Sequence, residues 1–577
     1  MNTTSNVWVD GITIGDALRE TAKRFPERDA VVFPDVNSTG ESQIQSANES
    51  YYRRNYREFD EDVDRVAKAL LGLGIQKGEH VAVWATNWPR WVLLQFATAR
   101  IGAVMVTINP AYRSSELSYV LKQSDAVTLF LIGQFRSSNY FQMVADAVPE
   151  LSTATPNPEE TTQSVRSDEY PKLRHVVSMQ SSAEKGMWTW DDFLSLGNEV
   201  TDESLQERES QLKPGDPINI QYTSGTTGFP KGAMLTHRNL LLNAYYVGDC
   251  QSISEHDRIC VPVPFYHCFG CVLGVLCCTV YGAAMIVPAE YFQPEATLSA
   301  VEKERATALY GVPTMFIGQL EHPSFPGCDL SSLRTGIMAG SPCPIELMKR
   351  VVNDMGAREI TIAYGLTEAS PVITQTRTDD PLELRVETVG RPIPDIEVKI
   401  IDPATGETLG DNQQGELCTR GHVVMLGYYN MPEQTAAAID DDGWLHSGDL
   451  AVRQPDGYYR ITGRIKDMIC RGGENIYPRE IEEFLYTHPA IEDVAIVGVP
   501  DPKFVEEVAV WIKLKEGQTA TEEEIREFCK ENLAHFKVPR YIKFVTEFPQ
   551  TVTGKIRKFK IRDLMIEELG LSSEETA

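Results

Sequence analysis

One stretch of the sequence combines glycines, small hydroxyl residues and a lysine, as phosphate-binding loops do. It covers residues 221–232 and reads QYTSGTTGFPKG. Glycines let successive backbone N–H groups turn toward one anion, and hydroxyls and an ammonium add donors for phosphate oxygens. The spacing is not that of a P-loop, because Pro230 precedes the lysine. We interpret the stretch as a triphosphate cradle rather than a flexible surface loop. Its candidate residues are Thr223, Ser224, Gly225, Thr226, Thr227, Gly228 and Lys231.

Strands and helices must position this cradle and its partners. Residues 217–220 predict a buried strand before the cradle, and residues 239–242 predict the start of a helix after it. Two further segments directly follow predicted strands: Gly340-Ser341, and YGLTE at residues 364–368. Ligands of α/β sheets bind at the carboxyl ends of strands, so we expect both segments in the same site. Glu368 offers the oxygen ligands that Mg²⁺ prefers when it shares substrate phosphates, although a glutamate here also suits a helix cap.

Three later segments add charged groups. Asp449 lies in WLHSGDL at residues 444–450, Arg464 and Lys466 lie in GRIKD at 463–467, and Lys555 lies in PQTVTGKIRK at 549–558. Taken singly, a Ser-Gly-Asp sequence is typical of an ordinary turn and a lysine after glycine of a basic surface turn. Their order along one chain is the informative feature.

Together these segments resemble the signature motifs of the adenylate-forming superfamily, which includes acyl-CoA synthetases, adenylation domains of peptide synthetases and luciferases. The resemblance spans essentially the whole chain. The run from residue 463 to 483 is most similar to that of medium-chain fatty acyl-CoA synthetases. The resemblance implies ATP and CoA as substrates and Mg²⁺ as the metal.

The resemblance also implies a role for each matching residue. The cradle holds the β- and γ-phosphates, Glu368 and Thr223 bind Mg²⁺, and Lys555 reaches from a small mobile domain to the carboxylate and α-phosphate. Asp449 accepts hydrogen bonds from the ribose hydroxyls, and Lys466 is the hinge. The remaining implied ATP-binding residues are Gly340, Ser341, Tyr364, Gly365, Thr367 and Arg464.

Two further sites are implied, for CoA and for the acyl group. The loop Arg471, Gly472, Gly473 and Glu474 corresponds to the lining of the pantetheine tunnel, where two glycines let a thiol arm pass close to the backbone. The implied acyl pocket contains Phe265, Tyr266, His267, Gly270 and Gly340. His267 fits a catalytic gate and a hydrogen-bonded structural histidine equally well.

The elements predict an α/β fold. Helices and strands alternate through most of the chain, which indicates parallel-type sheets covered by helices. Short strands from about residue 389 indicate a small β-barrel, and a compact α+β unit follows residue 464. We therefore predict an N-terminal domain of two sheet subdomains plus the barrel at residues 1–464, and a mobile C-terminal domain at 465–577.

Composition limits the partners. The net charge of −28 over 577 residues argues against nucleic acid and anionic membrane surfaces. The apolar run 265–287 is interrupted by glycines, so we expect a buried helix, a turn and a strand rather than a membrane span. Eleven cysteines show no disulfide or zinc spacing beyond Cys268 and Cys271, for which burial is the favoured explanation. The N-terminus lacks a targeting pattern, so we expect a cytoplasmic protein, and we leave a homodimer open.

The predicted activity is ATP-dependent acid–CoA ligation through acyl-AMP, with a medium- to long-chain fatty acid as substrate. Three alternatives remain at this stage: a ligase for aromatic or other acids, an adenylating enzyme with another acceptor such as a separate carrier protein, and a non-catalytic protein on the same fold. The last is disfavoured because five charged candidates are all present, namely Lys231, Glu368, Asp449, Arg464 and Lys555.

Overall fold

The computed structural model describes residues 7–33, 52–157, 164–223, 230–341, 343–472, 474–551 and 555–571. Six predicted site residues lie outside these ranges: Ser224, Gly225, Thr226, Thr227, Gly228 and Gly473.

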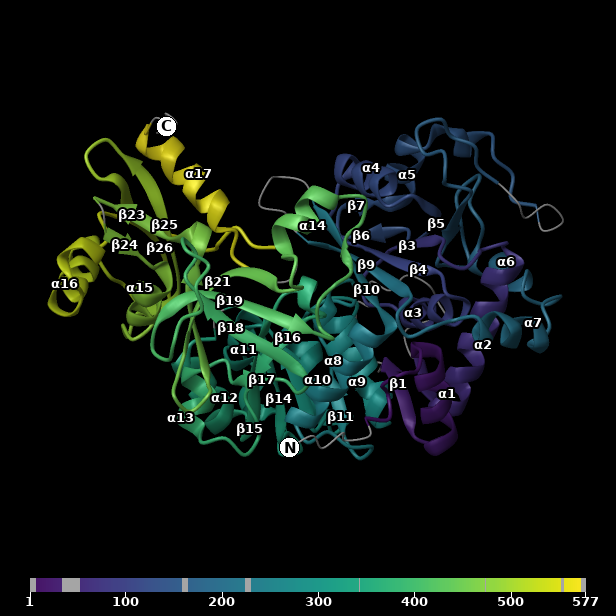
Figure 1. Cartoon of the computed structure of the whole chain (residues 1–577), viewed down its shortest axis with the longest axis horizontal. Coiled ribbons are helices and arrows are strands. Elements are labelled where there is room, and N and C mark those ends of the chain that lie inside the picture. The colour runs from purple at the N-terminus through teal and green to yellow at the C-terminus, as the bar shows by residue number, and fades with distance from the viewer. Residues whose placement is uncertain are drawn as a thin grey trace.

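Two large sheets form the N-terminal part of the molecule (Figure 1). The nine-stranded sheet has the order β17-β16-β15-β14-β13-β11-β12-β1-β2, with parallel pairing from β15 to β1 and antiparallel pairing at both edges. Its strands are β1 (Asp29–Phe33), β2 (Tyr52–Asn55), β11 (Arg258–Cys260), β12 (Ala284–Ile286), β13 (Ala308–Gly311), β14 (Thr335–Ala339), β15 (Glu359–Gly365), β16 (Val372–Gln375) and β17 (Arg391–Pro392).

The seven-stranded sheet has the order β20-β10-β9-β4-β3-β5-β8. Its strands pair in parallel from β8 to β9. Strand β10 then pairs antiparallel with β9, and β20 pairs antiparallel with β10. Its strands are β3 (His80–Trp84), β4 (Val104–Ile108), β5 (Ala126–Leu131), β8 (His175–Ser178), β9 (Pro217–Thr223), β10 (Lys231–Thr236) and β20 (Gly427–Tyr428). The sequence did not predict β10, so the two described ends of the cradle, Thr223 and Lys231, lie on paired antiparallel strands rather than on a strand and a helix.

Buried helices pack against these sheets. α3 (Pro89–Ile101) is buried from Trp91 to its end at Gly102, whose positive φ of 70° terminates the helix. α8 (His237–Cys250) begins at a capping box on Thr236 and contacts both β10 and β16, so it joins the two sheets. The run 265–287 forms the predicted buried helix, turn and strand: η2 (Phe269–Leu276), α9 (Cys277–Tyr281), Gly282 and β12.

Further helices and short elements complete this part. The helices are α1 (Ile14–Arg24), α2 (Tyr56–Gly72), α4 (Ser114–Gln123), α5 (Tyr140–Ala147), α6 (Trp190–Ser195), α7 (Asp202–Ser210), α10 (Pro294–Lys303), α11 (Pro313–Leu320), α12 (Ile345–Asp354), α13 (Leu382–Glu387) and α14 (Pro432–Ala438). Short pieces are β6 (Gln134–Phe135), β7 (Ser138–Asn139), η1 (Pro149–Ser152), η3 (Phe325–Gly327) and η4 (Thr367–Ala369). Among the described residues, no helix is both long and apolar enough to cross a membrane.

The region of the predicted barrel forms a four-stranded antiparallel sheet in the order β18-β19-β21-β22. Its strands are β18 (Ile396–Ile401), β19 (Gln414–Gly421), β21 (Leu445–Arg453) and β22 (Tyr459–Arg464). Within the described residues β18 and β22 are its two edges, so the sheet stays open. Strands β21 and β22 carry Asp449 and Arg464 opposite each other.

A separate C-terminal domain follows η5 (Ile465–Asp467) and lies beside the N-terminal part (Figure 1). It contains β23 (Ile469–Arg471), β24 (Glu474–Ile476), α15 (Pro478–Leu485), β25 (Ile491–Asp501), β26 (Val505–Leu514), α16 (Glu522–Asn532), η6 (His535–Lys537), β27 (Tyr541–Phe544) and α17 (Lys558–Leu569). The main core of the chain ends at Ile461, and two apolar clusters within residues 469–565 form the core of this domain. The predicted fold class is therefore confirmed.

Candidate active site

The cradle begins and ends on paired strands. Thr223, the last residue of β9, is opposite Lys231, the first residue of β10. Thr223 Oγ1 lies 3.5 Å from Glu368 Oε1, and the Lys231 ammonium lies 4.4 Å from the centre of the Tyr428 ring. The hairpin thus brings a hydroxyl and an ammonium, eight residues apart in sequence, close to the glutamate of another sheet.

The segment after β15 carries Tyr364, Gly365, Thr367 and Glu368 in a tight turn. A Cβ at Gly365 would lie 1.8 Å from the Pro371 carbonyl oxygen, so only glycine fits this backbone approach. The turn continues into η4, which places Thr367 and Glu368 immediately beyond the strand. The Glu368 carboxylate accepts a 2.7 Å hydrogen bond from the Tyr428 hydroxyl.

Asp449 is held between two neighbours. Its Oδ2 accepts a hydrogen bond of 2.8 Å from the Tyr364 hydroxyl, and its Oδ1 lies 3.0 Å from Arg464 Nε. The Asp449 charge raises the pKa of Arg464. Tyr364, Asp449 and Arg464 therefore join β15, β21 and β22 at one point.

Glu416, which the sequence did not single out, supports the turn before Asp449. Its Oε1 accepts the Gly448 N–H at 2.9 Å, and its Oε2 lies 3.0 Å from His446 Nδ1. Gly448 has a positive φ of 69°, a conformation that glycine adopts without strain. Glu416 thus fixes the backbone that presents Asp449.

Lys555 of the C-terminal domain lies near Asp449 and Arg464. The turn that carries it is closed by the Lys555 N–H donating to Thr551 Oγ1 at 3.0 Å. A Cβ built at Gly340, whose φ is 89°, would lie 3.7 Å from Lys555 Cε, so the glycine leaves room for the lysine stem. Burial, followed by the nearby Arg464 charge, lowers the pKa of Lys555 to about 8, while Asp449 and Glu368 oppose the shift.

His267 and its neighbours form the segment predicted to contact the acyl group, in which Phe265 is buried and Tyr266 and His267 are half-buried. His267 Nδ1 accepts the Phe269 N–H at 3.2 Å. Burial and the Lys555 charge lower the pKa of His267 to about 3, so the ring is neutral near pH 7. Phe265 packs at 5.4 Å from Trp91, and a Cβ at Gly270 would lie 2.2 Å from the Pro264 carbonyl oxygen.

The Cys268 and Cys271 thiols are buried against one glutamine. Cys268 Sγ donates to Gln221 Oε1 at 3.2 Å, and Gln221 Nε2 donates to Cys271 Sγ at 2.9 Å. Both cysteines are free. Burial raises the pKa of Cys268 well above its ordinary value, so this thiol is a packing group rather than a reactive thiolate.

The predicted CoA loop is held within the C-terminal domain. Arg471 makes two bonds to the buried Glu507, from Nε at 2.7 Å and Nη2 at 2.8 Å. The Gly472 N–H donates to the Phe504 carbonyl oxygen at 2.7 Å, and Glu474 begins β24. Lys466 lies in η5, at the junction, where burial and Arg464 lower its pKa.

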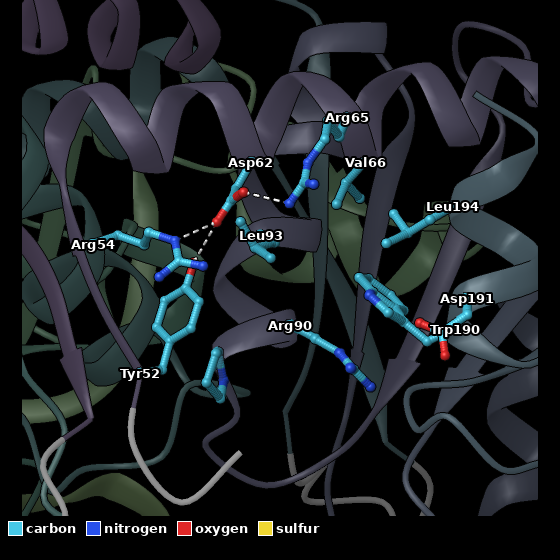
Figure 2. A pocket seen from close by; sticks show the side chains of 11 residues that line it. Tyr52, Arg54, Asp62, Arg65, Val66, Arg90, Leu93, Trp190, Asp191 and Leu194 are labelled. Atoms are coloured by element: carbon cyan, nitrogen blue, oxygen red, sulfur yellow. Dashed lines mark hydrogen bonds and ion pairs between the residues drawn. The ribbon is translucent and has the colours of Figure 1, made fainter. Parts of the chain in front are cut away.

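A separate pocket of about 250 Å³ lies between α2, α3 and α6 (Figure 2). Asp62 accepts hydrogen bonds there from Arg54, Tyr52 and Arg65, at 2.8, 3.2 and 2.6 Å. Arg90 lies 5.0 Å from the Trp190 ring. Among the described residues, its lining contains none of the predicted ATP or acyl residues.

The structure thus brings together most of the predicted ATP residues that it describes. Three cations and two carboxylates surround one site, namely Lys231, Arg464, Lys555, Glu368 and Asp449. Among the described residues, the partners found for Arg471 of the CoA loop are Glu507 and Phe504, which lie in its own domain. Such a set can neutralise a polyphosphate and hold a ribose.

Comparison with known proteins identifies the family. The family model described as "AMP-binding enzyme" matches residues 18–429, and that of the "AMP-binding enzyme C-terminal domain" matches 480–555. A putative acyl-CoA synthetase, YngI of Bacillus subtilis, is 52% identical over 98% of this chain and 99% of its own length. The mitochondrial medium-chain acyl-CoA ligase ACSF2 of Danio rerio is 42% identical over 97% of this chain and 89% of its own.

Solved structures agree with this assignment. The anthranilate CoA ligase AuaEII in complex with anthranoyl-AMP has a TM-score of 0.80 at 25% identity, covering 97% of this chain and 98% of its own. ATP-bound MatB from Rhodopseudomonas palustris has a TM-score of 0.75 at 25% identity, covering 96% and 99%. The chain therefore belongs to the AMP-binding enzyme family and, within it, to the acyl-CoA synthetases.

Proposed function

We propose that this enzyme activates a medium- to long-chain fatty acid as acyl-AMP and then transfers the acyl group to CoA. One observation carries the proposal: the side chain of Lys555 extends from the C-terminal domain to Gly340, where it is half-buried and within the electrostatic range of Asp449 and Glu368. A cation at that point serves the step in which charge builds up at an α-phosphate. Similarity to acyl-CoA synthetases supplies the reaction class.

The first half-reaction needs charge neutralisation and alignment rather than a protein nucleophile. A carboxylate oxygen of the acid attacks the α-phosphorus of ATP, the bond to the bridging oxygen breaks, and pyrophosphate leaves with the electron pair. We assign Lys555 to the developing charge at the α-phosphate, and Lys231 and the hydroxyl cradle to the β- and γ-phosphates. Preorganised cations in a buried site stabilise such a transition state strongly.

We assign the nucleoside to the residues around Asp449. Tyr364, Gly365, Gly340 and Ser341 would contact the adenine, and Thr367 a phosphate. Asp449 would exchange its hydrogen bond from Tyr364 for bonds from the ribose hydroxyls, while Arg464 stays beside it. We assign Asp449 to the ribose because its two carboxylate oxygens already contact a tyrosine hydroxyl and an arginine.

The donor set beside the cradle fits Mg²⁺. Glu368 and Thr223 place a carboxylate and a hydroxyl oxygen 3.5 Å apart, and hard oxygen ligands that share a site with phosphates are those that Mg²⁺ prefers. When bound, the ion would neutralise phosphate charge. Glu368 and Thr223 would hold it.

The second half-reaction requires a different face of the C-terminal domain. The CoA thiol attacks the acyl carbon, the acyl–phosphate bond breaks, and AMP leaves. We propose domains at 1–464 and 465–577 that rotate about Lys466, so that Lys555 leaves and the Arg471, Gly472, Gly473 and Glu474 loop enters. Both glycines would allow the pantetheine arm to pass close to the backbone.

We place the acyl group along Phe265, Tyr266, His267, Gly270 and the buried run that follows. The supporting observation is that every residue of η2 is buried and apolar, which suits an aliphatic tail. An aromatic acid is the second candidate, because the anthranilate CoA ligase has the same fold over nearly the whole chain. Eleven free cysteines favour a reducing compartment, and we propose the cytoplasm.

A pyrophosphate-release screen tests the proposal. The enzyme, ATP and Mg²⁺ are incubated with acetate, C6–C18 fatty acids, benzoate and coumarate, each with and without CoA. Release that rises strongly with CoA for mid-length aliphatic acids is the expected result. An aromatic preference would replace the substrate class, CoA-independent turnover would indicate another acceptor, and no release with any acid would contradict the proposal.

A further inference from the structure

Tyr428 lies between the two charged groups at the phosphate end of the site. It is the last residue of β20, which pairs with β10 so that Tyr428 is opposite Ala233, two residues beyond Lys231. Its hydroxyl donates to Glu368 Oε1 at 2.7 Å, and the Lys231 ammonium lies 4.4 Å from its ring centre. The side chain is buried, with the residue 6% exposed. One ring thus contacts both candidate phosphate-site residues.

We propose that Tyr428 is a positioning residue of the adenylation step, which holds Glu368 through its hydroxyl and Lys231 through its ring face. This inference rests on the proposed function, because it assigns to Tyr428 the placement of the metal ligand and of the phosphate-binding lysine.

The arrangement keeps two opposite charges available. A lysine and a glutamate in one small site tend to form an ion pair, which would neutralise both before the nucleotide arrives. Here the Lys231 ammonium lies over the Tyr428 ring, and the Glu368 carboxylate accepts a hydrogen bond from the Tyr428 hydroxyl. Tyr428 thus gives each charged group a neutral partner. The ammonium keeps its charge for phosphate oxygens and the carboxylate keeps its charge for Mg²⁺.

The hydroxyl also fixes the orientation of the carboxylate. It binds Oε1, the oxygen that lies near Thr223, while Oε2 receives no hydrogen bond from any described residue. Glu368 is therefore held by one oxygen and left available at the other.

The backbone around Tyr428 is fixed on both sides. Its N–H donates to Thr435 Oγ1 at 2.9 Å, and the Tyr429 N–H donates to the Gly232 carbonyl oxygen at 2.8 Å. The Met425 N–H donates to the Glu368 carbonyl oxygen at 3.0 Å. The segment is thus hydrogen-bonded both to β10, which carries Lys231, and to the turn that carries Glu368. These bonds fix the position of the Tyr428 ring.

Two variants separate the two contacts. Tyr428→Phe removes the hydroxyl and keeps the ring, so the Mg²⁺ concentration that half-saturates pyrophosphate formation should rise by about tenfold, with KM for CoA unchanged. Tyr428→Leu also removes the ring face, so KM for ATP should rise by a further factor of about three. The matched control is Tyr429→Phe, because the Tyr429 hydroxyl donates to another carboxylate, Asp125 Oδ2, at 3.0 Å.

A binding experiment keeps this inference separate from the proposed function. Mn²⁺ binding to each protein with a non-hydrolysable ATP analogue is measured by electron paramagnetic resonance, which needs no turnover. Weaker Mn²⁺ binding in Tyr428→Phe than in Tyr429→Phe supports the inference even if the wild type forms no acyl-AMP. Equal Mg²⁺ and Mn²⁺ dependence in the two variants would overturn it, and so would a loss in Tyr428→Phe that scales only with a lowered unfolding temperature.

Discussion

Two arginine–carboxylate pairs, whose arginines are seven residues apart on either side of the domain junction, differ in the exposure of the arginine. Arg464 pairs with Asp449 at 3.0 Å, and the two side chains are 54% and 10% exposed. Arg471 pairs with Glu507 at 2.7 Å, and the two side chains are 13% and 1% exposed. The arginine of the first pair is accessible to a nucleotide, whereas both members of the second pair are enclosed in the C-terminal domain.

We infer from this difference which half of the reaction the observed arrangement would serve. Lys555 lies half-buried at the nucleotide side, beside Gly340, while Arg471 is bonded to Glu507 and lies 4.4 Å from the centre of the Phe504 ring. Under the proposed function this placement would serve adenylation, and CoA would need another placement of the C-terminal domain.

The largest expected effect is that of Lys555→Ala. Loss of the cation that we assign to the α-phosphate should lower acid-dependent ATP–pyrophosphate exchange by about 10³-fold or more. Thioester formation from supplied acyl-AMP should remain largely intact, because in the proposed rotation Lys555 leaves the site for that step. Lys558→Ala is the matched control, since Lys558 pairs with Glu482 inside its own domain at 2.6 Å. Equal loss of both half-reactions would refute the two-placement assignment.

Lys466→Pro should have the opposite pattern. Proline fixes φ at the junction, so the domain would be held in its present placement and thioester formation from acyl-AMP should fall by about 10²-fold. Pyrophosphate exchange should be nearly unchanged. Lys466→Ala, which removes the side chain but keeps the backbone free, should retain both activities. Unimpaired thioesterification in the proline variant would show that rotation does not occur about Lys466.

The pH dependence of adenylation also tests the role of Lys555. Lys555 has a pKa near 8 without nucleotide, so it is charged below pH 8 and neutral above it. Since adenylation needs the charged form, kcat/KM for ATP should fall by about tenfold between pH 7 and 9. Lys555→Arg should remove this decline, because arginine stays charged. A wild-type profile that stays flat to pH 9 would contradict the assigned role.

The smallest predicted effect concerns the enclosed pair. Glu507→Gln should loosen the Arg471 loop and lower the rate of thioester formation about fivefold, because the bidentate bond to Arg471 weakens. Pyrophosphate exchange should be unaffected. Glu492→Gln, which removes the ion pair with Lys513 on the same sheet, is the control. If Glu507→Gln slowed exchange as much as thioester formation, the pair would not be specific to the CoA step.

Part of the candidate site could be proposed from local motifs. Glycine, hydroxyl and charged residues within a few positions of a strand end predict a phosphate or metal site, so Lys231 and Glu368 were proposed from their own segments. Asp449 and Lys555 were proposed only from the order of the segments and the family resemblance. The strand at 217–220 was also predicted, because a short apolar run marks it, although β9 continues to Thr223.

What the sequence did not predict depends on pairing between distant segments. Tyr428 acquires its role only because β20 pairs with β10, roughly two hundred residues earlier in the chain. Glu416 supports Asp449 only because β19 pairs with β21. Strand β10 itself was missed because its residues Lys231–Thr236 follow directly on the glycine-rich loop and precede a clear helix. No local composition signals these contacts.

A single-turnover chase tests the central claim most directly. Enzyme in excess over labelled fatty acid is mixed with ATP and Mg²⁺ but no CoA, quenched at successive times, and then chased with CoA in a parallel sample. The account predicts enzyme-bound acyl-AMP and equimolar pyrophosphate before the chase, and conversion to acyl-CoA and AMP after it. Pyrophosphate that forms only once CoA is present, or ADP in place of AMP, would contradict the two-step mechanism.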